Sequence, residues 1–175
     1  YPRSARVSKL MIGRIWKLGD DINTDVLAPG SYIKLPIEQL AAHCLETVNP
    51  NFSKSIKKGD IVVAGKNFGI GSSREQAAQV LKILGVASVI ATSFGGIFYR
   101  NAFNLGLPVV SCQNVDDLKS NDEISLDLRL GKIKNITRNI ELSAEPVPDN
   151  LMKLIEAGGL VSSLEAKLGI SQGEN

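Results

Sequence analysis

Residues 61–76 read IVVAGKNFGIGSSREQ, a β-branched run that leads directly into a glycine-rich turn. The run at 61–65 predicts a buried strand, because it shows no alternation of apolar and polar positions. The turn opens a predicted helix over about 73–85, which ends at Gly85. Strand, turn and helix in this order form the first half of a parallel β-α-β unit.

The chain repeats this order downstream and adds further strands and helices on either side. Alternating strands and helices favour an α/β fold with a parallel layer, and the outer segments add antiparallel strands at both ends. We therefore expect a mixed sheet with flanking helices. The expected strands are 9–18, 86–92, 107–112 and a hairpin of 123–129 with 132–138; the expected helices are 36–46, 96–105, 149–157 and 161–168, with loops at 19–30 and 49–59.

The composition of the 175-residue chain is that of an ordinary globular protein, with 43% hydrophobic and 22% charged residues. We expect a single domain over residues 9–175, preceded by a flexible extension at 1–8. The formal net charge of +2 and the lack of a basic run with aromatics argue against nucleic acid as a partner. No apolar stretch reaches the roughly 18 residues that cross a bilayer, so no membrane association is expected.

The N-terminal stretch YPRSARVS lacks the apolar core of a secretory signal. Two origins stay open for it, a cloning scar and the remnant of a cleaved transit peptide. The expected location is the cytoplasm, or an organelle stroma or matrix if a transit peptide was removed.

Cysteine and histidine are scarce, with Cys44, Cys112 and His43 as the complete set. Two cysteines do not make a disulfide framework, and they fit a reducing compartment. Zinc and iron–sulfur sites usually take about three or four Cys or His ligands, so no metal site is expected in this chain. Any cluster would have to be held by another chain. Packing is the expected role of His43 and Cys44.

The glycine-rich turn has the features of a carboxylate cradle. Helix N-termini present unpaired N–H groups that attract anions, and Gly69 and Gly71 let the backbone bend and approach a ligand. Arg74 adds a planar fork suited to a carboxylate, and Ser72 and Ser73 add hydroxyl groups.

Two other interpretations of the turn stay open. Ser72 and Glu75 have the spacing of a capping box, which serves helix stability alone. A stand-alone anion- or nucleotide-binding module is the alternative of a different class. A nucleotide is the less favoured ligand, because the turn lacks both the Walker A ending and the GxGxxG spacing.

Several longer segments resemble the small subunits of the aconitase superfamily, in particular those of 3-isopropylmalate dehydratase and homoaconitase. The resemblance covers roughly residues 10–168. It implies a swivelling β/β/α domain and a separate large subunit that binds a [4Fe–4S] cluster, in a heterodimer or heterotetramer with the active site between the two chains. The segments are GRIWKLGDDINTDVLAPGSYI, GKNFGIGSSREQA, VIATSFGGIFYRNAFNLGLPVV and IEAGGLV.

The resemblance also implies a hydro-lyase reaction. Water is removed from a hydroxy acid and added back at the neighbouring carbon, which interconverts 2- and 3-isopropylmalate in leucine biosynthesis, while the partner's cluster acts as the Lewis acid. It implies that Ser72 is the base and that Ser73 and Arg74 bind the substrate carboxylate. Asp25 and Lys34 match further substrate-binding positions, with an Asx turn or N-cap and a solvated surface lysine as their alternatives.

The chain departs from the common family pattern at several positions. Gln76 stands where many isopropylmalate subunits have histidine, and Ile70 stands where cysteine is common. A cation at Lys34 would be unfavourable beside an isopropyl group and favourable beside a third carboxylate. The alternative substrate is therefore homoaconitate or another malate-type acid. Arg100 and Asn101, in the FYRN segment, are interpreted as structural or interfacial residues.

Overall fold

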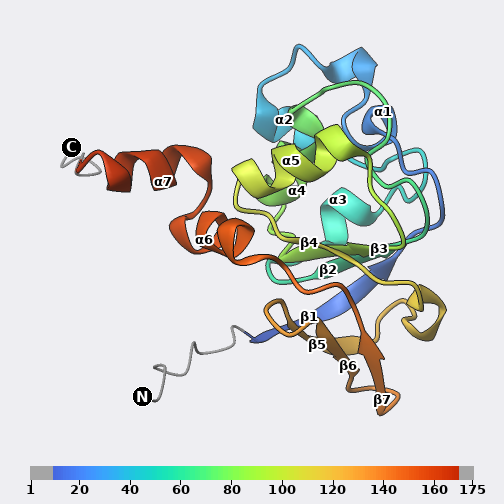
Figure 1. Cartoon of the computed structure of the whole chain (residues 1–175). Coiled ribbons are helices and arrows are strands. Elements are labelled where there is room, and N and C mark those ends of the chain that lie inside the picture. The colour runs from blue at the N-terminus through green and yellow to red at the C-terminus, as the bar shows by residue number, and fades with distance from the viewer. Residues whose placement is uncertain (1–9, 170–175) are drawn as a thin grey trace.

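The computed structural model describes residues 10–169, which form a mixed seven-stranded sheet in the order β4-β3-β2-β1-β5-β6-β7 (Figure 1). The expected extension at residues 1–8 lies outside the described residues. The sheet has a parallel half and an antiparallel half, so the α/β class and the mixed sheet are confirmed. The strands are β1 Leu10–Lys17, β2 Ile61–Ala64, β3 Ser88–Ala91, β4 Val109–Ser111, β5 Glu123–Asp127, β6 Lys132–Asn135 and β7 Ile140–Ser143.

Strand β1 joins the two halves of the sheet. Its C-terminal part pairs in parallel with β2, with Ile15 opposite Ile61, and its N-terminal part pairs antiparallel with β5, with Ile12 opposite Ser125. The expectation of antiparallel strands at both ends of the chain is confirmed, because β1 pairs antiparallel with β5, and the β5–β6 and β6–β7 pairs are antiparallel. Strand β4 closes the other edge of the sheet as a parallel strand. Strand β7, Ile140–Ser143, was missed from the sequence.

Helices α1 to α5 gather on one side of the sheet, whereas α7 extends away from the body (Figure 1). Two short helices, α1 and α3, occupy segments that were expected to be loops. Each has only four residues, so no apolar periodicity marks it, although Asn23 caps α1 by accepting a hydrogen bond from the Val26 N–H at 2.8 Å. The helices are α1 Thr24–Leu27, α2 Ile37–Ala41, α3 Phe52–Ser55, α4 Gln76–Ile83, α5 Gly96–Asn104, α6 Asp149–Ala157 and α7 Leu160–Lys167, with 3-10 turns η1 Gly30–Tyr32 and η2 Val115–Asp117.

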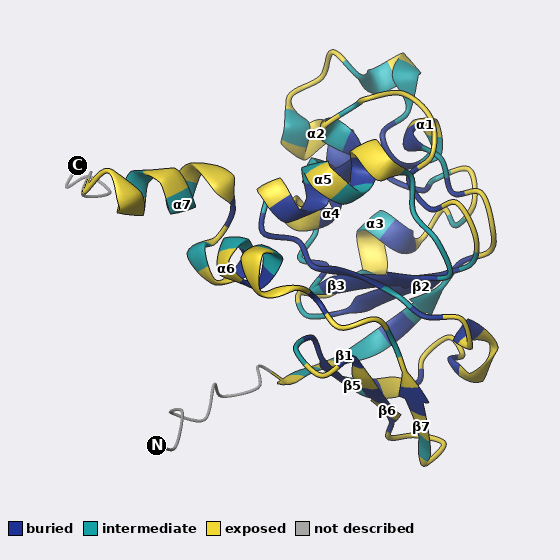
Figure 2. Cartoon of the chain, in the orientation of Figure 1, coloured by how far each residue is buried: buried dark blue, intermediate teal, exposed yellow. Residues whose placement is uncertain are grey.

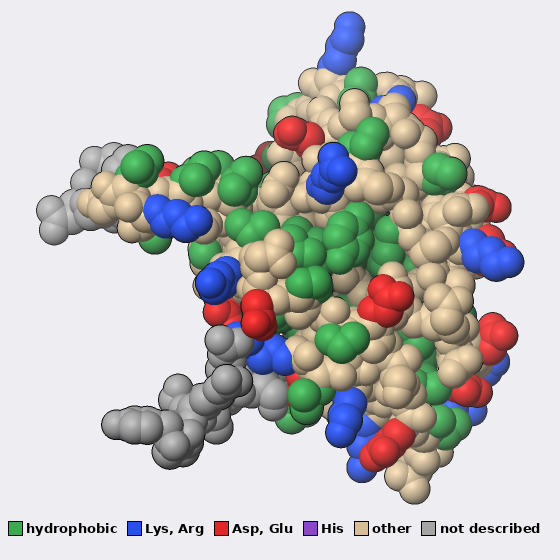
Figure 3. All heavy atoms as spheres, viewed as in Figure 1, with side chains coloured by type: hydrophobic (Ala, Val, Ile, Leu, Met, Phe, Trp, Pro, Cys, Tyr) green, Lys and Arg blue, Asp and Glu red, His purple; other side chains and the backbone are tan. Residues whose placement is uncertain are grey.

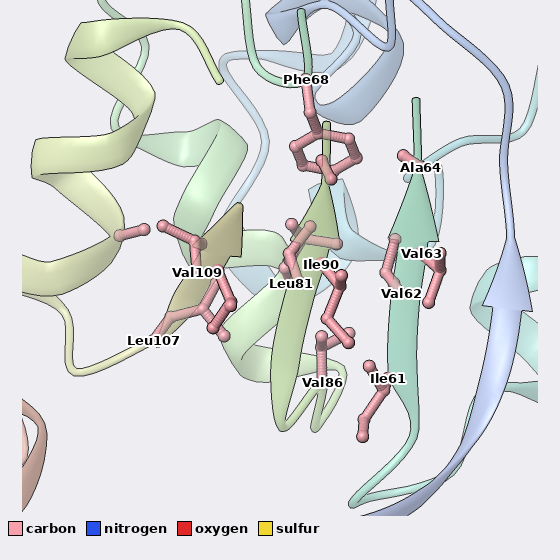
Figure 4. Packing of buried hydrophobic residues seen from close by; sticks show 14 of the residues in the cluster. Ile61, Val62, Val63, Ala64, Phe68, Leu81, Val86, Ile90, Leu107 and Val109 are labelled. Atoms are coloured by element: carbon pink, nitrogen blue, oxygen red, sulfur yellow. The ribbon is translucent and has the colours of Figure 1, made fainter. Parts of the chain in front are cut away.

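The core lies between the parallel strands and the helices that cover them. All four residues of β2 and all four residues of β3 are fully buried, and these two strands are dark blue in Figure 2. Figure 4 shows the β2 side chains beside Ile90 of β3 and Leu81 of α4, with Phe68 above the strand ends. Burial of each such aliphatic side chain contributes about 1.5–3 kcal/mol. A strand covered on both faces explains why residues 61–64 show no polar alternation.

The surface is mixed in charge. Lysine and arginine alternate with aspartate and glutamate on the face in Figure 3. Hydrophobic side chains lie along the projecting helix α7, where Leu160, Val161, Leu164 and Leu168 are exposed at or just beyond the helix. Among residues 10–169, no helix is long and apolar enough to span a membrane.

Candidate functional site

Two loops that are far apart in sequence run side by side and build the candidate site. Residues 19–24 follow β1 and residues 65–72 follow β2, so the parallel pairing of these strands delivers both loops to one edge of the sheet. Backbone hydrogen bonds then join the loops. The bonds are Gly65 N to Gly19 O at 3.1 Å, Asp21 N to Lys66 O at 2.8 Å, Gly69 N to Ile22 O at 2.7 Å and Thr24 N to Ile70 O at 2.9 Å.

The two glycines of the turn are required by geometry. Gly69 has a φ of +77°, and a Cβ on it would lie 2.2 Å from Cγ of Phe98. Gly71 has a φ of +125°, and a Cβ on it would lie 2.8 Å from Oγ1 of Thr24. Residues with a side chain rarely adopt these dihedrals and would also clash, so both positions need glycine.

Ser72 is exposed and rests on the buried hydroxyl group of Thr24. The Ser72 N–H donates to Thr24 Oγ1 at 3.1 Å, and the two hydroxyl oxygens are 3.3 Å apart. Because Thr24 Oγ1 accepts the amide hydrogen, its own hydrogen can be donated to Ser72 Oγ. Thr24 is 4% exposed and was missed from the sequence, although it stands next to Asp25 in the NTD segment.

The capping-box interpretation is wrong. Helix α4 begins at Gln76 and not near residue 73, its cap position is Glu75, and no side chain caps it. The chain bends at Gly71 and Ser72 and stays non-helical through Arg74, while the Ser72 N–H is bound to the Thr24 side chain of the other loop. Within the described part of the chain, the amides of residues 73–76 donate no hydrogen bond. These N–H groups precede the helix and are available to an anion.

Arg74 is held by the neighbouring loop. Its Nη1 donates to Asp25 Oδ1 at 2.9 Å and to the carbonyl of Ala28 at 3.0 Å. Asp25 Oδ1 also accepts the Gly30 N–H at 2.9 Å. The hydrogen bond from Arg74, followed by that from Gly30, holds the pKa of Asp25 below its usual value. Asp25 is therefore ionised near neutral pH and orients the guanidinium.

The loop that carries Lys34 begins beside Arg74. A Cβ on Gly30 would lie 3.3 Å from Nη2 of Arg74, which places the start of the loop against the guanidinium. Lys34 follows the η1 turn and is exposed. It forms no hydrogen bond or ion pair within residues 10–169. Ser73, the remaining predicted substrate-binding residue, is exposed between Ser72 and Arg74.

Three other positions discussed from the sequence lie around this site. Ile70 is 45% exposed at the turn. Asn101 lines a hollow of about 210 Å³ together with Glu75 and Leu160, and Arg100 is exposed on α5. The structural or interfacial role expected for Asn101 and Arg100 stays a prediction.

The cysteines do not fit a metal centre. Cys44 and Cys112 are both buried, and burial raises the pKa of each thiol, which disfavours the thiolate that a metal needs. His43 Nδ1 is 2.8 Å from Glu46 Oε2. Among residues 10–169, no group of three or more histidine, cysteine or acidic side chains is placed to hold a metal ion.

Known proteins are similar to this chain in both sequence and fold. Residues 38–114 match the aconitase C-terminal domain. The 3-isopropylmalate dehydratase small subunit 1 of Thermotoga maritima is 48% identical over 155 residues, which cover 87% of this chain and 93% of that protein. A methanogen homoaconitase small subunit from Methanothermobacter thermautotrophicus is 47% identical over 151 residues, covering 86% and 88% of the two chains.

The solved structures agree with the sequence comparison. The crystal structure of 3-isopropylmalate dehydratase from Methanocaldococcus jannaschii superimposes with a TM-score of 0.87 at 41% identity, over 92% of this chain and 96% of that one. Identity at this level over nearly the whole length shows common descent as well as a common fold. The chain belongs to the family of 3-isopropylmalate dehydratase small subunits, within the aconitase superfamily.

Proposed function

We propose that this chain, together with a large subunit, interconverts 2- and 3-isopropylmalate by dehydration and rehydration, a step of leucine biosynthesis in the cytoplasm. The observation that carries the proposal is the exposed Ser72-Ser73-Arg74 turn, in which a hydroxyl, a guanidinium and open amides lie together. Family membership supports the reaction class. It gives no support to a stand-alone anion- or nucleotide-binding module.

Ser72 is the proposed base that takes a proton from the carbon beside a substrate carboxylate. An unassisted serine is a weak base, and its alkoxide needs hydrogen-bond donors around it. Thr24 supplies one donor from the buried side, with the two hydroxyl oxygens 3.3 Å apart. The Arg74 guanidinium and the open amides after Ser72 make the surroundings of the turn favourable to negative charge.

Arg74 and Ser73 are the proposed carboxylate-binding pair. Asp25 and Ala28 engage only Nη1 of Arg74 among the described residues, which leaves Nε and Nη2 for a bidentate contact. Asp25 acts through Arg74 in this proposal, because its own negative charge would repel a carboxylate. The backbone of the turn, at Gly69 and Gly71, keeps Ser72 close to Thr24.

A partner chain is needed for two physical reasons. Ser72 and Ser73 are exposed, and water around an alkoxide would weaken each stabilising interaction, so another surface must cover them. Loss of the substrate hydroxyl also needs a Lewis acid, and the described residues of this chain offer no ligand set for one. We assign both tasks to the large subunit and expect a [4Fe–4S] cluster there.

Homoaconitate is the second candidate substrate. Lys34 is an exposed cation on the loop that starts beside Arg74, and a third carboxylate would favour a cation there. One similar protein is named as a homoaconitase small subunit.

The substrate is tested by assembling the chain anaerobically with its cognate large subunit and measuring kcat/KM for 3-isopropylmalate and for homoaconitate. We expect a preference for 3-isopropylmalate, and Lys34→Ala should then change kcat/KM for it little. A preference for homoaconitate that is lost in Lys34→Ala would overturn the isopropylmalate assignment. Activity on neither acid would contradict the proposed function.

Replacement of Ser72 by Ala in the assembled enzyme should lower kcat by at least about 100-fold, the contribution typical of a positioned general base. Ser73→Ala is the matched control, since it removes a neighbouring hydroxyl and should raise KM more than it lowers kcat. Co-elution with the large subunit should be normal for both variants. A Ser72→Ala enzyme with wild-type kcat would exclude Ser72 as the base.

Replacement of Thr24 by Val removes the hydroxyl while keeping the side-chain shape, and we expect kcat to fall about tenfold or more, as for loss of one hydrogen bond to a developing charge. The pH at which the base half-titrates should rise, because the alkoxide loses a donor. Thr24→Ser should restore both values. An unchanged pH–rate profile in Thr24→Val would show that Thr24 only supports the turn.

A further inference from the structure

The single histidine of the chain stacks on the loop that carries Lys34. The rings of Tyr32 and His43 have centroids 3.6 Å apart and planes within 9° of each other. Tyr32 ends the η1 turn, two residues before Lys34, and His43 follows helix α2. The stack therefore holds the loop at Tyr32, two residues after Gly30, where the loop is bonded to Asp25.

His43 is itself held in place by the segment around it. The Leu45 N–H donates to the Val26 carbonyl of α1 at 3.0 Å, and Leu45 is fully buried with a φ of +60°, so this turn is tied to the helix that carries Asp25. His43 Nδ1 lies 2.8 Å from Glu46 Oε2. An ionised carboxylate has no hydrogen to give, so Nδ1 carries the hydrogen and Glu46 fixes the orientation of the ring.

The contacts form a continuous path from His43 to the proposed carboxylate-binding arginine. The ring of His43 holds Tyr32, and the same loop is bound at Gly30, whose N–H donates to Asp25 Oδ1 at 2.9 Å. Asp25 in turn binds Arg74. The loop is thus fixed at two points before Lys34, at Gly30 by the Asp25–Arg74 pair and at Tyr32 by the histidine.

We propose that His43, oriented by Glu46, is a positioning residue that holds the Tyr32–Lys34 loop against the substrate side of the site. It touches neither substrate nor base, and it acts by limiting the conformations of the loop. The expected consequence is on substrate binding, because an ordered loop loses less conformational entropy when it closes on a ligand. This inference rests on the proposed function for its catalytic consequence and on the geometry alone for the ordering of the loop.

The ordering is tested without any activity assay, by trypsin cleavage of the full chain at the Lys34–Leu35 bond, followed by mass spectrometry. In His43→Ala this cleavage should accelerate about three- to tenfold, the factor expected from loss of one aromatic pair. His43→Phe, which keeps a flat ring, should remain near the wild-type rate. Glu38→Gln is the control for loss of an exposed charge on α2 and should change nothing.

Two results would overturn the ordering. One is an unchanged cleavage rate in His43→Ala. The other is equal acceleration at all lysine and arginine sites, which would indicate loss of the fold and not release of the loop.

The catalytic consequence is tested in the assembled enzyme, where His43→Ala should raise KM several-fold at nearly constant kcat and His43→Phe should restore KM. An unchanged KM together with faster cleavage at Lys34 would overturn the role in substrate binding while leaving Ser72 as the base. Activity of the assembled enzyme on neither acid would instead contradict the proposed function, and the cleavage result would still stand. The two failures are therefore distinguishable.

Discussion

The parallel pairing of β1 with β2 is the constraint on which the candidate site depends. It places the ends of both strands at one edge of the sheet, so that the loops after them leave in the same direction. The loops then continue the pairing through backbone hydrogen bonds between residues 19–24 and 65–72. Each such bond contributes only ~1 kcal/mol net. Together they bring Ser72, Thr24 and Asp25 into one small area, although Ser72 and Thr24 are 48 positions apart and Arg74 and Asp25 are 49 positions apart in the sequence.

The site consists of a lower layer of supporting residues and an exposed layer of groups that can contact a ligand. Thr24 and the glycines of the turn lie beneath Ser72 and fix its backbone, while Asp25 and Ala28 fix Arg74 at its Nη1 atom. The exposed layer keeps the hydroxyl groups, the open amides and the rest of the guanidinium for a ligand. A site that is rigid below and open above is what the proposed closure by a large subunit requires.

Much of the fold was predictable because its signals are local. The buried run at 61–64, the glycines that end α4 and α5, and the alternation of strand and helix all act within a few residues. The role of β1 was not predictable in this way, since a strand pattern does not say which neighbours it pairs with or in which direction. The short helices α1 and α3 were missed because four residues make only about one helical turn, which cannot show a 3.6-residue period.

The site was predicted only in part, because some of its features lie within one short segment and others are contacts between two distant loops. One short segment of the sequence contains the glycines at 69 and 71 and the order Ser72-Ser73-Arg74. The Asp25–Arg74 pair and the support of Ser72 by Thr24 cross between loops and appear only when the sheet is assembled. The capping-box interpretation failed for the same reason, because Ser72 contacts Thr24 of the other loop and α4 begins only at Gln76, with no side-chain cap.

Amide hydrogen exchange on the isolated chain tests the central claim most directly, which is that the paired loops preform the site. The amides of Thr24 and Gly69, which donate across the two loops, should be protected far more strongly than the open amides of residues 73–76. Exchange of all these amides at the same fast rate would show that the turn forms only in the presence of a partner. The account of a preformed site would then be wrong.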